Sequence, residues 1–282
     1  MSRDAWVLSW AMAIGHILLG ALVILVKLGG SVITDKSRLK TFRASSCARL
    51  AKELRPVRDD LVLTHGAGSF GHIEAKKHAL HKGFRSKEQL AHVAAVQRDV
   101  RELNLKVLGS MIDNGIRAVS IPPAAAATFT DGVIGSFDSE PFRNVLSLGL
   151  TPVTFGDVVP DESMGFSICS GDLMMVALAR EFTPDLVVFC ADVDGVFDSD
   201  PKRNRSAKLM PEFDSSGLRG LKRTAASNAD VTGSIYGKLE RMLAIAQHCE
   251  KCMIVNGNVP GRLEKALSGK QVVSTVVVPG KV

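Results

Sequence analysis

The stretch Val23–Ser31 constrains the fold of this chain more than any other part of the sequence. Its first four residues are apolar and mostly β-branched, which is typical of a strand buried in a parallel sheet. Lys27 follows, and then come Gly29 and Gly30, whose missing side chains let the backbone approach a neighbour closely. Ser31 adds a hydroxyl donor. Such a stretch indicates an anion site outside the carboxyl ends of the strands of an α/β protein, although a tight turn beside a solvated lysine explains the same residues.

The rest of the chain alternates strand patterns with helical patterns. This alternation predicts an α/β fold, a three-layer αβα sandwich with a mainly parallel central sheet. The run 186–190 is apolar throughout, so we expect it in the middle of the sheet. Strands are also expected at residues 60–64, 118–121, 151–155, 252–255 and 272–278, a hairpin at 160–168, and helices at 44–55, 86–114, 140–148, 172–182 and from 232 onward.

Residues 1–22 are interpreted as an N-terminal apolar extension ahead of a single domain over residues 23–282. The chain is almost entirely apolar from Ala5 to Val26, a length that suffices to span a bilayer. The end of this run is needed for the first strand, however, and no positive segment or small-residue cleavage site marks a signal peptide. We therefore do not expect a membrane anchor.

The composition argues against a nucleic-acid-binding protein. The chain has 35 basic and 29 acidic residues, a net charge of +6, with no run of five like charges, and its one tyrosine and two tryptophans offer no stacking platform for bases. A modest basic excess suits a small anionic substrate better. The five cysteines are an odd number scattered through apolar runs, which predicts reduced thiols and a cytoplasmic location. Cys249 and Cys252 form a lone CxxC pair, for which we expect neither a zinc nor a redox role.

The segment Gly66–Gly71 matches the GxGxxG pattern, follows a predicted strand and opens a predicted helix. A dinucleotide-binding fingerprint requires this context, but a lone match is weak, and Glu88 is the only acidic residue near the right distance for a ribose contact. The turn need not be specific for a dinucleotide, because backbone amides at a helix N-terminus bind anions of any kind. His72 directly follows the turn, and we expect it to donate to the same anion.

A second glycine segment, Gly233–Lys238, resembles a P-loop but fails its spacing, and Leu239 replaces the hydroxyl residue that would hold magnesium. What remains is a helix N-terminus with Lys238 on its second turn. Asp172 and Asp192 are carboxylates at the sheet edge where ligands bind, although Asp172 also suits a simple helix cap. Glycine turns, lysines and carboxylates gathered at one edge favour phosphoryl transfer, in which catalysis is mostly positioning and charge neutralisation.

Four histidines lie close in the sequence, which raises the question of a metal cluster: His65, His72, His78 and His81. They have no cysteine partner, and the carboxylate among them, Glu74, lacks helical spacing to a pair of histidines. We therefore expect no metal site formed by the protein's own residues.

Taken in order, these segments resemble the motifs of the amino acid kinase superfamily and, within it, of the isopentenyl phosphate kinases. The segment Lys27–Lys36 resembles the family's opening strand and loop, and His65–His72 is similar to its most diagnostic motif. The remaining motifs follow in the family's order at 170–172, 191–197, 230–238 and 255–261. The match spans the chain from about residue 23, and as an ordered set it is highly specific.

The resemblance implies ATP-dependent conversion of isopentenyl phosphate to isopentenyl diphosphate with Mg²⁺, in isoprenoid biosynthesis. It implies a nucleotide-side set of Lys27, Gly29, Gly30, Ser31, Gly68, Asp192, Gly233 and Lys238. It implies an acceptor-side set of Gly66, Ala67, His72 and Gly156, and a catalytic set of Lys27, Lys36, His72 and Asp172. It also implies a homodimer, with an acceptor-binding lobe over about 23–170 and a nucleotide-binding lobe over about 171–282.

The chemistry of the acceptor agrees with this set of residues. An acceptor phosphate has a second pKa of about 6 and is largely dianionic at neutral pH. Such a nucleophile needs no general base, but it needs cations and amides that offset the repulsion between two anions. Three alternatives remain: a kinase of the same fold acting on another small phosphate or phosphonate such as fosfomycin, a dinucleotide-binding oxidoreductase, and a non-catalytic nucleotide-binding regulator. Residues 122–150 are not assigned to any motif.

Overall fold

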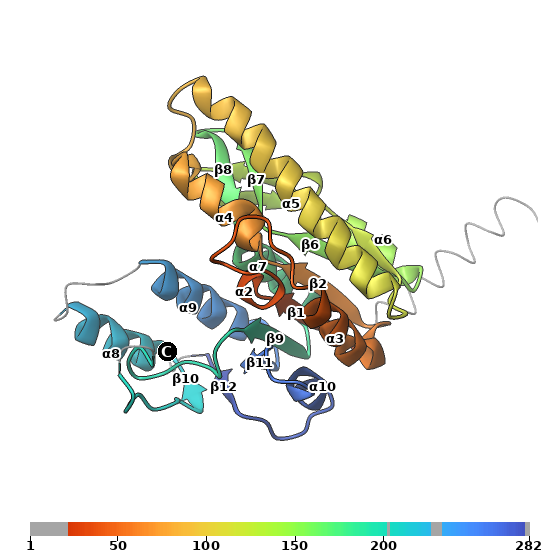
Figure 1. Cartoon of the computed structure of the whole chain (residues 1–282). Helices are drawn as coiled ribbons and strands as arrows, with labels where there is room; N and C mark the ends of the chain where they lie inside the picture. Colours follow the sequence, from red (N-terminus) through yellow and green to blue (C-terminus); the bar gives the residue numbers. More distant parts are fainter. Residues whose placement is uncertain (1–21, 202–203, 227–232, 280–282) are drawn as a thin grey trace, which may run out of the picture.

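The structure is a computed structural model that describes residues 22–201, 204–226 and 233–279, so the predicted extension lies outside the described residues except for Leu22 (Figure 1). Within this part, eight strands form one sheet in the order β10-β12-β11-β9-β1-β2-β6-β3. Every neighbouring pair is parallel except β11 with β12. The strands are β1 Ile24–Leu28, β2 Leu61–His65, β3 Ala118–Ser120, β6 Thr151–Phe155, β9 Leu186–Ala191, β10 Glu212–Phe213, β11 Lys251–Asn256 and β12 Ser274–Val277.

The residues of β1 alternate between two hydrophobic cores. Leu25 packs in one core with residues of α7 (Gly171–Phe182) and α9 (Gly233–Ala246). Val26 packs in the other core, with residues of α3 (Ala44–Leu54), α5 (Glu88–Ile112) and α10 (Arg262–Leu267). Because successive side chains of a strand point to opposite faces, helices cover both sides of the sheet. The predicted three-layer αβα sandwich with a mainly parallel sheet is confirmed.

The remaining helices are α2 Gly30–Ile33, α4 Gly68–Lys77, α6 Glu140–Ser147 and α8 Ser215–Ala226, with 3₁₀ turns at Arg55–Val57, Leu80–Lys82 and Pro123–Ala125. The predicted helices and strands occur within a few residues of their expected bounds. Helices α2, α8 and α10 and strand β10 were not predicted. The six residues of α10 are too few to show two turns of periodicity, and α8 contains Gly217 and Gly220, which weaken its helical pattern in the sequence.

Two hairpins pack beside the sheet, β4 (Ala127–Thr130) with β5 (Val133–Phe137) and β7 (Asp157–Asp161) with β8 (Gly165–Cys169). The second contains the hairpin predicted at 160–168 and starts three residues earlier. Asp161 joins the two, because its carboxylate accepts from the backbone N–H groups of Gly132 at 2.8 Å and Met164 at 2.9 Å. The first hairpin was not predicted, since its strands are short, half-exposed and shifted in register.

Figure 1 shows α4, α5, β7 and β8 at one end of the molecule and α8, α9 and β10 at the other. Strands β1 and β2 lie between these ends (Figure 1). Among the described residues, no helix has the length and apolar character needed to cross a membrane. All five cysteines are free thiols, as predicted.

Candidate active site

Two glycine loops meet backbone to backbone at the carboxyl ends of β1 and β2. A Cβ placed on Gly30 would lie 2.6 Å from the N and Cα atoms of Gly68, and one placed on Gly66 would lie 2.8 Å from the N atom of Gly30. Both distances are shorter than real Cβ contacts, so only glycine fits. Gly68 also has a φ of +51°. The structure therefore brings together the two glycine turns that were predicted separately from the sequence.

Helix α4 begins at Gly68, within the second of the two loops. The N-cap residue of α4, Ala67, makes no side-chain cap hydrogen bond of its own. Thr34 links the loops instead: its Oγ1 donates to the carbonyl of Gly30 at 2.6 Å and accepts from the amide of Ser69 at 3.0 Å. A helix does begin at the predicted glycine turn, and anion binding there stays a prediction. Thr34 holds the two loops together and was missed by sequence reasoning.

Lys27 and Asp172 form a buried ion pair between β1 and α7. The Lys27 Nζ atom donates to Asp172 Oδ1 at 2.6 Å, and Lys27 is only 6% exposed. Burial lowers the pKa of Lys27, and Lys238 and Arg241 lower it further against the opposing effect of Asp172. Burial opposes the charged form of Asp172, but Lys27 and Lys238 outweigh it, so the pKa of this carboxyl is lowered.

The helix-cap interpretation of Asp172 is therefore not needed. Ser170 is the N-cap residue of α7, and its hydroxyl accepts from the amide of Leu173 at 3.2 Å. The side chain of Asp172, in the first turn, is directed to Lys27 instead.

His72 lies in the first half of α4, near the same cations. Its ring is accessible to solvent, yet the surrounding protein desolvates the charged form, and Lys27 and Lys36 repel it, so the pKa of His72 is lowered. Asp172 acts in the opposite direction but is the weaker influence. The structure thus brings His72 into the same electrostatic neighbourhood as the predicted lysines.

A further group of interacting side chains in this region consists of Ser31, Asp192 and Lys36. Ser31 Oγ donates to Asp192 Oδ1 at 2.8 Å, and Lys36 Nζ lies 3.7 Å from Asp192 Oδ2. Lys36 is 65% exposed, so the pair is a weak and adjustable one. Gly29 sits against β9, because its amide donates to the carbonyl of Cys190 at 2.8 Å and a Cβ there would lie 2.6 Å from the same oxygen.

Helix α9 begins at Gly233, in agreement with the predicted helix start, although the surroundings of Gly233 lie outside the described residues. Lys238 and Arg241 of this helix are close enough to act electrostatically on both Lys27 and Asp172. Arg241 was missed by sequence reasoning. Its spacing of three residues from Lys238 places both on one helix face, and this was the available signal.

Gly156 completes the region from the β6 side. A Cβ on Gly156 would lie 3.2 Å from the amide nitrogen of Gly171 and 3.6 Å from that of Ala67. His65, at the end of β2, is fully buried and contributes to the frame: its Nδ1 is 3.1 Å from the carbonyl of Gly66, and its Nε2 is 3.1 Å from Asn104 Nδ2. Burial lowers the pKa of His65 to about 4, so the ring is neutral and supports the glycine loop.

The described residues of this site form a set of cations and amides around two converging loops. The carboxylates of Asp172 and Asp192 already accept from neighbouring side chains. Such a set is suited to holding phosphate groups close to one another, because it neutralises negative charge without removing a proton.

Comparisons with known proteins agree with this geometry. The sequence pattern of the amino acid kinase family matches residues 23–256. Isopentenyl phosphate kinase of Thermoplasma acidophilum is 35% identical over 242 residues, which cover 86% of this chain and 94% of that protein. Isopentenyl phosphate kinase of Methanothermobacter thermautotrophicus is 35% identical over 262 residues, which cover 90% of this chain and 98% of that protein. An X-ray structure of isopentenyl phosphate kinase superposes with a TM-score of 0.79 at 31% identity, covering 91% of this chain and all of that one. The chain belongs to the amino acid kinase family, in the group that contains the isopentenyl phosphate kinases.

Proposed function

We propose that this chain transfers the γ-phosphoryl group of ATP to the phosphate of isopentenyl phosphate, yielding isopentenyl diphosphate and ADP. The observation that carries the proposal is the convergence of the two glycine loops beside Lys27, Lys36 and His72. Similarity to isopentenyl phosphate kinases over nearly their full length supports this acceptor.

In the proposed reaction an oxygen of the acceptor phosphate attacks the γ-phosphorus of ATP in line. The new O–P bond forms as the bond from the γ-phosphorus to the β–γ bridging oxygen breaks, and the electron pair leaves with ADP. The dianionic acceptor has no proton to lose, so the chain's task is to hold two anions together. Lys27 and the amides at the start of α4 are assigned to the phosphates between donor and acceptor, and Lys36 to the transferred group.

His72 is assigned to the acceptor phosphate. Its pKa is lowered in the chain described here, chiefly by desolvation and then by the nearby lysines. A bound dianion adds an opposite charge beside the ring, which favours the protonated form and so a charge-assisted hydrogen bond. Asp172 holds Lys27 in place through the 2.6 Å contact.

The donor set fits Mg²⁺ carried by the nucleotide rather than caged by the protein. Asp172 and Asp192 already accept from Lys27 and Ser31, and Mg²⁺ is commonly held by substrate phosphates and water with few carboxylates. When bound, the ion would supply further neutralisation of phosphate charge. Asp192, which lies beside the exposed Lys36, is the side chain we assign to its surroundings.

We further propose an acceptor-binding lobe over about 23–170 and a nucleotide-binding lobe over about 171–282. His72 and Gly156 belong to the first range, and Lys238 and Asp192 to the second; Figure 1 shows α4, which carries His72, apart from α9, which carries Lys238. A homodimer and a cytoplasmic location stay predictions.

A dinucleotide-binding oxidoreductase accounts less well for the site. In that fold the GxGxxG turn follows the first strand of the sheet unit, whereas here it follows β2 and packs against the loop after β1. That alternative also leaves Lys27 and Lys36 without a role.

The proposal is tested by measuring ADP release with isopentenyl phosphate, fosfomycin and an amino acid as acceptors. We expect turnover with isopentenyl phosphate, and good turnover with another acceptor alone would overturn the assignment.

His72→Gln should lower kcat/KM for the acceptor by about 10- to 100-fold, because a hydrogen bond to a charged group contributes about 1.5–3 kcal/mol. The KM for ATP should stay unchanged. His81→Gln, at an exposed histidine nearby in the sequence, is the matched control; an unaltered acceptor KM and kcat in His72→Gln would contradict the role of His72.

A further inference from the structure

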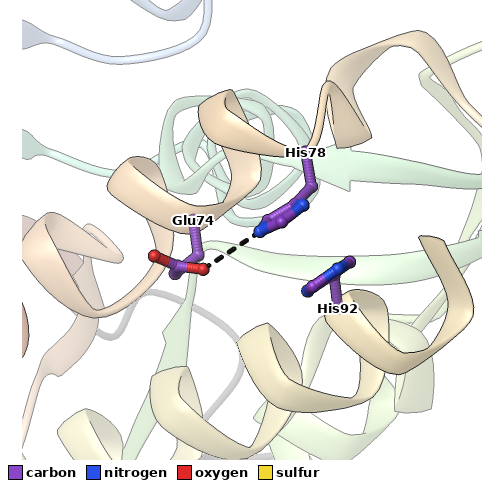
Figure 2. A group of neighbouring side chains, drawn as sticks. All are labelled: Glu74, His78 and His92. Atoms are coloured by element: carbon purple, nitrogen blue, oxygen red, sulfur yellow. Dashed lines mark ion pairs between the residues drawn. The ribbon is translucent and has the colours of Figure 1, made fainter. Parts of the chain in front are cut away.

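Three potential metal ligands meet between α4 and α5, and the first of them follows His72 by two residues on α4. Glu74 is in α4, His78 is the residue at its C-terminal cap, and His92 is in the second turn of α5. One ligand atom from each lies within 4.8 Å of the others. Figure 2 shows the three side chains pointing toward one another from the two helices. His92 is fourteen residues from His78 and on another helix, so sequence spacing does not connect it with the other two.

The contacts within this cluster are unusual for a purely structural one. His78 Nε2 lies 3.3 Å from Glu74 Oε2, yet within the described structure this buried nitrogen has no hydrogen-bond partner of acceptable geometry. The rings of His78 and His92 are stacked, with centroids 3.3 Å apart and planes 12° from parallel. A buried ring nitrogen without a partner is costly, and a cation between the nitrogen and the carboxylate would satisfy both.

The ligand chemistry identifies the class of cation. Two imidazole nitrogens and one carboxylate oxygen suit a borderline first-row dication, and this same set occurs at zinc sites that keep one open position. Zinc–ligand bonds of about 2.1 Å separate tetrahedral ligand atoms by about 3.4 Å, close to the 3.3 Å already present between His78 Nε2 and Glu74 Oε2. Lys77 lies 3.8 Å from the other oxygen of Glu74, but it is 66% exposed and competes weakly.

We propose that Glu74, His78 and His92 bind Zn²⁺ and thereby clip the C-terminal end of α4 to α5. The three side chains are partly buried; Glu74 is 24% and His78 21% exposed, so each can rotate by the small amount that closure around an ion requires. The site is independent of the proposed phosphoryl transfer, and its test does not use kinase activity.

The experiment uses the full chain made without a polyhistidine tag, treated with EDTA and desalted. ZnCl₂ is titrated by calorimetry, and CoCl₂ is followed by visible absorption. We expect a single equivalent to bind with a Kd in the micromolar range or below, and the melting temperature to rise by a few degrees at saturating zinc. The cobalt spectrum should show tetrahedral ligand-field bands without thiolate charge transfer, which separates this site from Cys249 and Cys252.

His92→Gln and His78→Gln should each weaken zinc binding by about tenfold or more, since even neighbours of metal ligands have effects of this size. His81→Gln, an exposed histidine outside the cluster, should bind as the parent chain does. Glu74→Gln provides a third ligand test should a histidine variant lose its fold, as judged by circular dichroism without metal. Absence of binding up to about 100 µM zinc, or parental affinity in the ligand variants, would overturn the proposal.

Discussion

Replacing Gly30 by alanine tests whether the two glycine loops must touch for the site to work. The backbone φ of Gly30 is not in the left-handed region, so alanine is permitted by the local conformation. The obstacle is the neighbouring loop, because the new Cβ would lie 2.6 Å from the N and Cα atoms of Gly68. These are backbone atoms, which cannot rotate away as a flexible side chain would.

The size of the effect follows from this distance. Ordinary van der Waals contact begins at 3.4 Å, against 2.6 Å here, so the loops must separate by about 0.8 Å. A misplacement of about 1 Å in an active site can lower the rate by about 100-fold, which corresponds to about 2.7 kcal/mol. Overpacking of this kind should also lower the free energy of unfolding by about 1–3 kcal/mol.

The assay couples ADP release to isopentenyl phosphate and ATP, with urea unfolding measured on the same samples. Gly109→Ala is the control: this glycine lies inside α5, and a Cβ there meets nothing within 4 Å. It should raise the free energy of unfolding by about 0.5–1 kcal/mol and leave turnover unchanged. Parental kcat/KM and stability in Gly30→Ala would refute the requirement for close contact between the loops.

Three further substitutions test the buried polar groups by urea unfolding. Asp172→Asn leaves the buried ammonium of Lys27 without its charged partner, so the free energy of unfolding should fall by about 3 kcal/mol; an unchanged value would contradict this. Burial raises the pKa of Asp157 to about 6, so its ionisation between about pH 4 and pH 6 destabilises the fold by about 3 kcal/mol. Asp157→Asn should therefore gain about that much relative to the parent as the pH rises from about 4 to about 7, and a constant difference would argue against it. Asn104→Ala removes the donor to His65 Nε2 and should lower the free energy of unfolding by about 1–3 kcal/mol, a loss that full retention of stability would exclude.

Much of the fold was predictable because it rests on local patterns. Strands β1 and β9 are continuous apolar runs, and the long helix α5 has buried residues at regular helical spacing. Both patterns are visible in the sequence. The β4–β5 hairpin was not predictable in this way. Its strands owe their position to Asp161, which is 29 residues from Gly132 and holds the turn through backbone contacts.

The candidate site was predicted as a list of residues and not as an arrangement. Glycine turns and strand-end lysines carry a local signal, and the structure brings them together at one sheet edge. Thr34 carries no comparable signal, because a threonine in a loop is ordinary until the fold gives it neighbours. The same holds for His92, whose partners come from another helix. The signal for Arg241 is weaker than a motif, since it consists only of the three-residue spacing from Lys238.

The pairing of β1 also bears on how the chain is made. One edge of β1 pairs with β2, which is synthesised soon afterwards, but the other edge pairs with β9 in a ladder that joins Ile24 to Leu186. At about 5–20 residues per second, a ribosome leaves that edge without its partner for on the order of ten seconds. An unpaired hydrophobic strand edge is a template for aggregation. A nascent or truncated chain that ends before β9 should therefore depend on chaperones, and the strand that carries Lys27 is the segment they would need to shield.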